Sequence, residues 1–283
     1  MSRPISETAG SASSCTNQHQ LTVDTYFKAR ARYWKEIYAK NDVYSIIHQQ
    51  RRTIVLAMVD KLGLPPDDQV LEVGCGAGLT TAELACRGYR VDAVDSVAEM
   101  VDLTRRHAAE TGVADRVKTV VADIHRLLFP NEHFSLVIVV GVLPWLEAIY
   151  EPIREVGRVT KAEGYLIVNM DNRWRLHELL DPRLNPVHAP IRKLARSLRH
   201  RNHLLQTQRC SPREFDVILH KAGYTKIHGT VLGFGPFTLL GQTVLPDSVG
   251  IKVHDALQRY ANRNFPLLRS TGAQYLVLAR KQS

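Results

Sequence analysis

Apolar residues in this chain occur in short continuous runs that alternate with stretches of helical spacing. A run of four to eight apolar residues bounded by turn signals is typical of a strand buried on both faces of a parallel sheet. Apolar residues that recur every three or four positions indicate helices instead. The alternation predicts an α/β fold, a doubly wound Rossmann-like sheet of seven strands with helices on both faces. The predicted strands cover residues 70–73, 89–96, 116–123, 133–141, 163–170, 225–233 and 273–280.

Local start and stop signals support the helices between these strands. Ser211 and Glu214 form an S-x-x-E capping box, and Gly223 stands where the helix should end. Ser96 and Glu99 repeat the capping-box pattern, which predicts that a helix starts directly after the second strand. The remaining helices are expected near residues 79–87, 146–159 and 251–263.

The stretch "VLEVGCGAGLT" at residues 70–80 joins the first strand to a helix through Gly74, Gly76 and Gly78. Backbone N–H groups and the positive end of a helix dipole meet in such a turn, which therefore suits a polar or anionic ligand. A phosphate-binding loop would end in Gly-Lys-Ser/Thr, and a dinucleotide fingerprint would require glycine at Leu79. Neither pattern is present.

The pattern E-x-G-x-G-x-G resembles motif I of the class I methyltransferases that use S-adenosylmethionine (SAM). The resemblance implies that Glu72 and the three glycines form the SAM-binding loop and that SAM is the cofactor. Asp95, at the end of the second strand, would accept hydrogen bonds from the ribose hydroxyls. Asp123, at the end of the third strand, would receive the adenine amino group, and the backbone N–H of Ile124 would contact the ring. Strand-terminal acids also serve as plain helix caps, so either acid alone carries little weight.

Residues 24–52 are dense in aromatic and basic side chains, and the segment 24–62 that contains them resembles the N-terminal helical flap of methyltransferases of the ubiquinone and magnesium-protoporphyrin type. On this resemblance Arg51 or Arg52 pairs with the carboxylate of SAM. Aromatic residues of the flap would wall the acceptor pocket, although packing on the buried face of a helix would explain them equally well. The pocket-wall candidates are Tyr26, Tyr33 and Trp34.

Methyl transfer from a sulfonium needs alignment of the reacting atoms more than it needs catalytic side chains. A general base helps when the acceptor is a hydroxyl or a phenol, and O-methylation of a small molecule is the leading hypothesis. Asp171 and His177 are the candidate catalytic residues, and His125 lies just beyond the adenine acid. Trp145 stands where the resembling enzymes place residues that border the methyl group. A surface role for each histidine is the simpler alternative.

Two other functions stay open at this stage. An RNA methyltransferase would use the basic flanks of the chain as its binding surface. However, "VLPW" at residues 142–145 does not match the Asn/Asp-Pro-Pro-aromatic pattern of enzymes that methylate base amines, and no cysteine lies there for carbon-5 chemistry. Nucleic acid is therefore a minor prediction. A SAM-binding protein without catalytic activity is the third hypothesis.

Charge is unevenly distributed along the chain, which has 37 Lys and Arg against 28 Asp and Glu. Residues 70–170 carry 10 basic and 14 acidic side chains, whereas residues 171–210 carry 9 basic and 3 acidic ones. This asymmetry favours an anionic partner beside the acceptor: an anionic or lipid-linked small molecule, a membrane surface contacted peripherally, or nucleic acid. A solvated arginine-rich surface is the alternative.

Two insertions interrupt the predicted sheet. Residues 171–207 form a basic helical insertion after the fifth strand, with an amphipathic stretch that would lie on a membrane or pack on its own domain. Residues 236–272 form a second insertion, between the sixth and seventh strands, that would extend the core or line the acceptor pocket.

Composition sets the remaining expectations. Residues 1–23 are Ser-rich and lack an apolar signal core, which predicts a disordered tail before a single domain at residues 24–283. No apolar run approaches the roughly 20 residues that cross a bilayer. The four cysteines have no paired metal-ligand spacing, so we expect no metal site and a reducing, cytoplasmic location.

Overall fold

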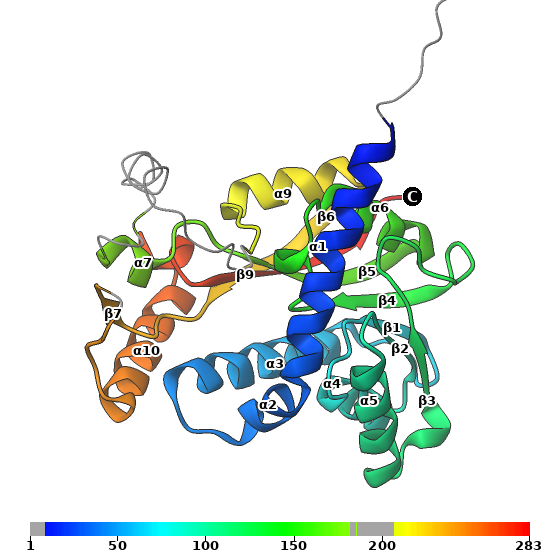
Figure 1. The fold of residues 1–283 in the computed structure, drawn as a ribbon, viewed down its shortest axis with the longest axis horizontal. Coiled ribbons are helices and arrows are strands. Elements are labelled where there is room, and N and C mark those ends of the chain that lie inside the picture. Colours follow the sequence, from blue (N-terminus) through cyan, green and yellow to red (C-terminus); the bar gives the residue numbers. More distant parts are fainter. Residues whose placement is uncertain (1–8, 182–184, 186–206, 241) are drawn as a thin grey trace, which may run out of the picture.

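The computed structural model describes residues 9–181, 185, 207–240 and 242–283, and it contains the predicted doubly wound sheet (Figure 1). Its strand order is β3-β2-β1-β4-β5-β9-β6, in which β9 runs antiparallel to both β5 and β6 and the other neighbours are parallel. All seven strands occur within a few residues of the predicted ranges. They are β1 (Gln69–Val73), β2 (Arg90–Asp95), β3 (Val117–Val121), β4 (Phe134–Val139), β5 (Thr160–Asp171), β6 (Tyr224–Leu232) and β9 (Gln274–Lys281).

Helices cover both faces of the sheet because the central strands are apolar on both sides. One face packs against α3 (Val43–Leu62), α4 (Leu79–Cys86) and α5 (Ala98–Glu110), and the opposite face packs against α6 (Tyr150–Val159) and α9 (Pro212–Lys221). The strand order reverses between β1 and β4. In such sheets the crevice at this point, outside the carboxyl ends of the strands, is the usual ligand site.

The two predicted capping boxes have different outcomes. The box at the start of α9 is confirmed, since Ser211 Oγ accepts from Glu214 N and the Glu214 carboxylate accepts from Ser211 N. The box predicted at Ser96 is wrong. The N-cap of α5 is Val97, and Ser96 Oγ donates to Asp24 Oδ1 (2.7 Å), a residue of the N-terminal helix. A long-range hydrogen bond has taken the side chain that the local pattern assigned to the cap.

The tail expected at residues 1–23 also needs correction, because α1 (Ala9–Ala29) is helical through most of it. Contacts with the body of the protein support this helix: His19 Nε2–H donates to the carbonyl of Trp145 (2.9 Å), and Val23 is buried. The serine-rich composition suggested disorder, but it gave no sign of these contacts. Residues 1–8 lie outside the described residues.

The insertions are described in part. The first contains α7 (Leu176–Leu180), and the predicted basic helix lies outside the described residues. The second contains a short hairpin and α10 (Asp247–Asn262), which contains most of the predicted helix. None of the helices in the described ranges has the length and apolar character that a membrane span requires.

Candidate active site

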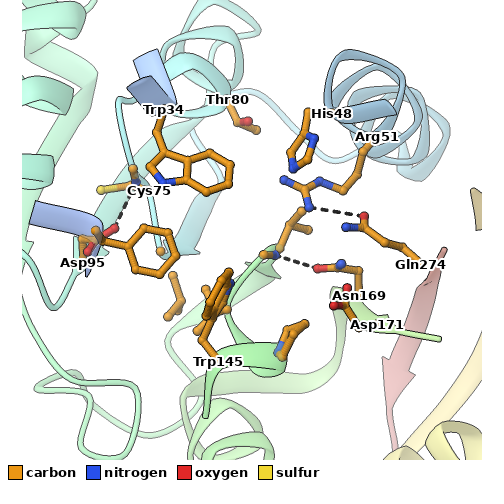
Figure 2. A pocket seen from close by; sticks show the side chains of 18 of the residues that line it. Trp34, His48, Arg51, Cys75, Thr80, Asp95, Trp145, Asn169, Asp171 and Gln274 are labelled. Carbon is orange, nitrogen blue, oxygen red and sulfur yellow. Dashed lines mark hydrogen bonds between the residues drawn. The ribbon is translucent and has the colours of Figure 1, made fainter. Parts of the chain in front are cut away.

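A cavity of about 420 Å³ lies at the carboxyl ends of the central strands, at the reversal of strand order (Figure 2). The glycine turn and Asp95 form one end, and Figure 2 shows Arg51, Gln274, Asn169 and Asp171 at the other. The segment from α1 to α3 supplies part of the wall, as the resemblance implied. Residues far apart in sequence therefore meet in one pocket.

The three glycines of the turn have positive φ angles and different surroundings. A Cβ on Gly74 would come within 2.2 Å of Val142 Cγ2, and a Cβ on Gly78 would come within 2.7 Å of the Thr104 backbone on α5. A Cβ on Gly76 would meet nothing within 4 Å. Gly74 and Gly76 line the cavity, whereas Gly78 holds the start of α4 against α5. The turn thus leaves room for a ligand at Gly74 and Gly76, and close packing against α5 fixes its position at Gly78.

Asp95 is positioned at the tip of β2 by backbone donors. Its carboxylate accepts from Gly76 N (3.1 Å) and Val97 N (3.0 Å). Burial raises the pKa of Asp95, and these two hydrogen bonds oppose that rise. Each carboxylate oxygen keeps a lone pair free. The arrangement is compatible with two further hydroxyl donors from the cavity.

Asp123 lies two residues beyond the end of β3 and also lines the cavity. Its Oδ1 accepts from the His125 backbone N (2.9 Å) and from His125 Nδ1–H (2.6 Å), and the interaction with His125 lowers the pKa of the carboxyl. Ile124 is buried and lines the same wall. His125 therefore anchors the acid expected to bind adenine and is itself absent from the cavity lining.

Glu72 is a buried acid beneath the glycine turn. It accepts a hydrogen bond from Thr81 Oγ1 at the start of α4. Burial raises the pKa of Glu72 to about 8, although the Thr81 hydrogen bond acts in the opposite direction. Burial therefore favours the protonated form of Glu72 in the folded protein.

Arg51 brings a positive charge into the cavity from α3. Its side chain is buried, and its Nη1 donates to Gln274 Oε1 (3.3 Å). Across the described part of the chain, no carboxylate oxygen lies within 4.0 Å of this guanidinium. Arg52 lines the cavity too, with its guanidinium 5.5 Å from the ring centre of Tyr38. Arg51 thus has donors available for a carboxylate.

The aromatic wall differs from the predicted one. Trp145 lines the cavity as expected, but Tyr26 packs behind it at 5.4 Å and Tyr33 is exposed. Helical geometry turns Tyr26 and Tyr33 away from the face that meets the pocket. Of the three candidates in the flap, Trp34 alone reaches the cavity. Sequence reasoning missed Phe27, Tyr38 and Tyr44.

Asp171 and His177 both line the far end of the cavity, but their surroundings differ. Asp171 forms an ion pair with Arg175, so its carboxylate is already engaged and is less available as a general base. Burial lowers the pKa of His177 to about 4, and Arg175 and Arg209 reinforce this shift. His177 is therefore a neutral imidazole at neutral pH. His48, also in the wall, has its pKa lowered to about 3, chiefly by burial.

Asn169, near the end of β5, was missed by sequence reasoning. Its Oδ1 accepts from Gly141 N (2.6 Å), which directs the Nδ2 amide toward the cavity. A polar residue inside the apolar run "LIVNM" was the available signal.

Buried side-chain polar atoms without a hydrogen-bond partner all fall in this cavity, as far as the described residues extend. They are Trp34 Nε1, Asn169 Nδ2, Arg175 Nη2 and His177 Nδ1, although Arg175 Nη2 is also in the ion pair with Asp171. An unpaired buried donor costs about 1–3 kcal/mol, so such atoms are ordinarily satisfied. Their concentration here points to a polar ligand that forms hydrogen bonds with them.

Comparison with known proteins supports this interpretation. Residues 71–168 match the family model described as "Methyltransferase domain". The chain contains a methyltransferase domain. The motif, the domain match and the residues of the pocket agree on SAM as its cofactor.

The relatives resemble this methyltransferase domain over part of their length. An uncharacterized methyltransferase, YodH, of Bacillus subtilis is 32% identical over 111 residues, which are 39% of this chain and 46% of that protein. A malonyl-[acyl-carrier protein] O-methyltransferase of Halorhodospira halophila is 37% identical over 39% of this chain and 37% of its own length. A ubiquinone biosynthesis O-methyltransferase of Aeromonas salmonicida is 26% identical over 54% and 63%. The matched region thus spans 37% to 63% of these relatives.

Solved structures confirm the fold. Magnesium protoporphyrin IX methyltransferase from Synechocystis, solved with bound S-adenosylhomocysteine (SAH), superimposes with a TM-score of 0.63 at 16% identity and covers 93% of this chain and 100% of its own. The [4+2]-cyclase SpnF superimposes with a TM-score of 0.62 at 15% identity, covering 92% and 95%. A cyclase and a methyltransferase share this fold, so the fold alone does not define the reaction.

We expect Asp95→Ala to weaken SAM binding by at least about 1 kcal/mol, because charge-assisted hydrogen bonds to the ribose would be lost. Isothermal titration calorimetry measures the change. Asp102→Ala, on the exposed surface of α5, is the control. Unchanged affinity in the Asp95 variant would remove this residue from the cofactor site.

Proposed function

We propose that this chain is a SAM-dependent methyltransferase that acts on a small-molecule acceptor, with oxygen as the methylated atom. One observation carries the proposal: a single cavity joins the glycine turn and its three acids to a second end where buried polar atoms of Asn169 and His177 have no hydrogen-bond partner among the described residues. A cofactor and a second molecule would therefore meet inside one enclosed space.

The first end of the cavity fits SAM. Asp95 would hold the ribose and Asp123 with Ile124 the adenine, while the open side of Gly76 leaves room for the backbone of the turn to approach the ligand. Arg51, on the side of the cavity opposite Asp95, would pair with the amino-acid carboxylate of SAM, because it is a buried cation without a carboxylate partner in the described ranges. When bound, SAM would supply the activated methyl group.

The second end fits an acceptor with oxygen atoms. Trp145 and Trp34 provide aromatic surface for a flat ring, and the Asn169 amide provides a fixed donor. If these residues hold the acceptor atom in line with the methyl group and the sulfur of SAM, this alignment can lower the activation barrier by about 7–11 kcal/mol. His177, neutral and facing this space, is the proposed proton acceptor. The ion pair between Asp171 and Arg175 would keep α7, the helix that carries His177, in place.

Two relatives are named as O-methyltransferases, one for malonyl-[acyl-carrier protein] and one for ubiquinone biosynthesis. This supports oxygen as the methylated atom in the present chain. An anionic or lipid-linked acceptor is part of the proposal, since a second cation, Arg52, lines the cavity besides Arg51 and the walls are aromatic.

Calorimetry with SAM, SAH and NAD tests the cofactor half of the proposal. We expect SAM and SAH to bind and NAD to give no heat. A panel of phenols and carboxylic acids, scored by SAH production, then tests the acceptor half. NAD binding in preference to SAM would refute the proposal, and SAM binding without turnover of any acceptor would favour a non-catalytic SAM-binding protein.

His177→Asn should lower the methyl-transfer rate by about 100-fold, the lower end of the 10²–10⁴ that general-base catalysis contributes, because a base with a pKa of about 4 is weaker than one matched to neutral pH. SAM affinity should not change. With the pKa of His177 lowered to about 4, its contribution to the rate should be constant from about pH 5 to 8. His220→Asn, on the exposed side of α9, is the control. Equal rates for the two variants would exclude His177 as the base.

A further inference from the structure

The carboxyl-terminal end of α10 exposes large apolar side chains to solvent. Tyr260, Phe265 and Leu267 are 52%, 54% and 65% exposed, and the rings of Tyr260 and Phe265 contact each other at 5.9 Å. Scattered apolar residues are normal on a surface, but these three lie within eight positions of a compact turn. Such a cluster of exposed apolar side chains is typical of a surface that binds a partner.

Positive charge surrounds these apolar side chains. Arg259, Arg263 and Arg269 are exposed, and within the described ranges none of them lies within ion-pair distance of a carboxylate. No acidic residue occurs between positions 256 and 283. The charges therefore remain available to an anionic partner.

The opposite face of α10 is fixed to the protein by polar contacts. His254 Nδ1 accepts from Phe234 N (3.0 Å), and Gln258 accepts from Gly233 N (3.1 Å) and donates to the carbonyl of Val231 (2.9 Å). These bonds are buried, and they prevent the helix from rotating its exposed face inward. The exposed side chains thus stand on a rigid support at the side of the molecule away from β3 (Figure 1).

Leu267 has a strained backbone, with φ 73° and ψ −56°. A non-glycine residue in this region costs about 1–3 kcal/mol. Here the strain accompanies one of the most exposed apolar side chains of the described residues, so no gain from core packing offsets it. Strain of this kind clusters at functional positions of a protein.

Trp174 is a further exposed aromatic residue, on a segment joined to the turn after α10. Its segment is tied to the turn after α10, because Asn172 Nδ2 donates to the carbonyls of Ser270 and Gly272 (2.8 Å each) and Leu176 N donates to that of Thr271 (2.8 Å). Trp174 is 41% exposed.

We propose that this aromatic-basic surface docks the protein on an anionic lipid bilayer. Its members are Trp174, Arg259, Tyr260, Arg263, Phe265, Leu267 and Arg269. Tryptophan and tyrosine favour the membrane–water interface, arginine is attracted to anionic headgroups, and Phe265 and Leu267 would enter the acyl boundary. Nucleic acid is a poorer partner, because an exposed aliphatic side chain such as Leu267 would bury little apolar surface against it. The proposal goes beyond methyl transfer and does not depend on it.

Flotation of the full chain with vesicles tests the surface. We expect binding to phosphatidylcholine vesicles that contain about 30% phosphatidylglycerol, little binding to phosphatidylcholine alone, and a decrease with salt. The double variant Phe265→Glu, Leu267→Glu and the triple variant Arg259→Gln, Arg263→Gln, Arg269→Gln should each reduce partitioning roughly tenfold or more.

The matched controls change similar side chains elsewhere. Val217→Glu, on exposed α9, and Arg105→Gln with Arg106→Gln, on exposed α5, should partition as the unaltered protein does. Circular dichroism and SAM titration confirm that each variant is folded. Equal losses in variants and controls, no binding to anionic vesicles, or tighter binding to a single-stranded RNA than to vesicles would each overturn the proposal.

Discussion

Gly78→Ala should lower the free energy of unfolding by roughly 2–5 kcal/mol. Two costs add. The left-handed backbone at φ 80° costs an L-residue about 1–2 kcal/mol, and a Cβ at 2.7 Å from the Thr104 backbone forces α4 and α5 apart at a further 1–3 kcal/mol. Urea denaturation measures the change. The separation of the two helices should also disturb the glycine turn and reduce SAM affinity.

Gly112→Ala is the matched control for this prediction. Gly112 has a similar φ of 73°, but a Cβ there would meet nothing within 4 Å. It should therefore show the backbone cost alone. If the two variants lose the same stability, the contact with Thr104 is not what requires glycine at position 78.

The sequence predicted the fold well because its strongest signals are local. Each buried strand is a continuous apolar run, and the carboxyl ends of parallel strands must meet at one edge of the sheet. Together with the resemblance to motif I, this position at the strand ends was enough to predict that Asp95 and Asp123 belong to one pocket. The helix start at Ser211 was equally predictable, since its capping box involves residues three positions apart.

Predictions failed where a distant contact decided the outcome. Ser96 bonds to Asp24, 72 positions away, instead of capping α5. Helix α1 is supported by a bond between His19 and the Trp145 carbonyl, 126 positions apart. Likewise, Arg51 meets Gln274 across 223 positions. No local pattern encodes such pairs, so the acceptor end of the cavity could be predicted only in part.

The stability of the protein should decrease between about pH 5 and 8 because of Glu72. In the unfolded chain a glutamate titrates near 4.5, whereas burial raises the pKa of Glu72 to about 8 in the fold. The native state therefore holds a proton that the unfolded state has released throughout this interval. Stability must then fall as pH rises, by up to ~1.4 kcal/mol per pH unit, and it levels off above the native pKa.

Glu72→Gln isolates this contribution, since glutamine keeps the shape and can still accept from Thr81 Oγ1. At pH 5 the variant and the unaltered protein should have similar unfolding free energies. By pH 8 the variant should be more stable by several kcal/mol. Glu147→Gln, in an exposed loop position, should follow the unaltered protein at every pH. If the glutamine variant shows the same pH dependence as this control, Glu72 is ionised in the fold at neutral pH. The glycine turn would then rest on a buried negative charge, which would itself attract the cationic sulfonium and ammonium groups of SAM.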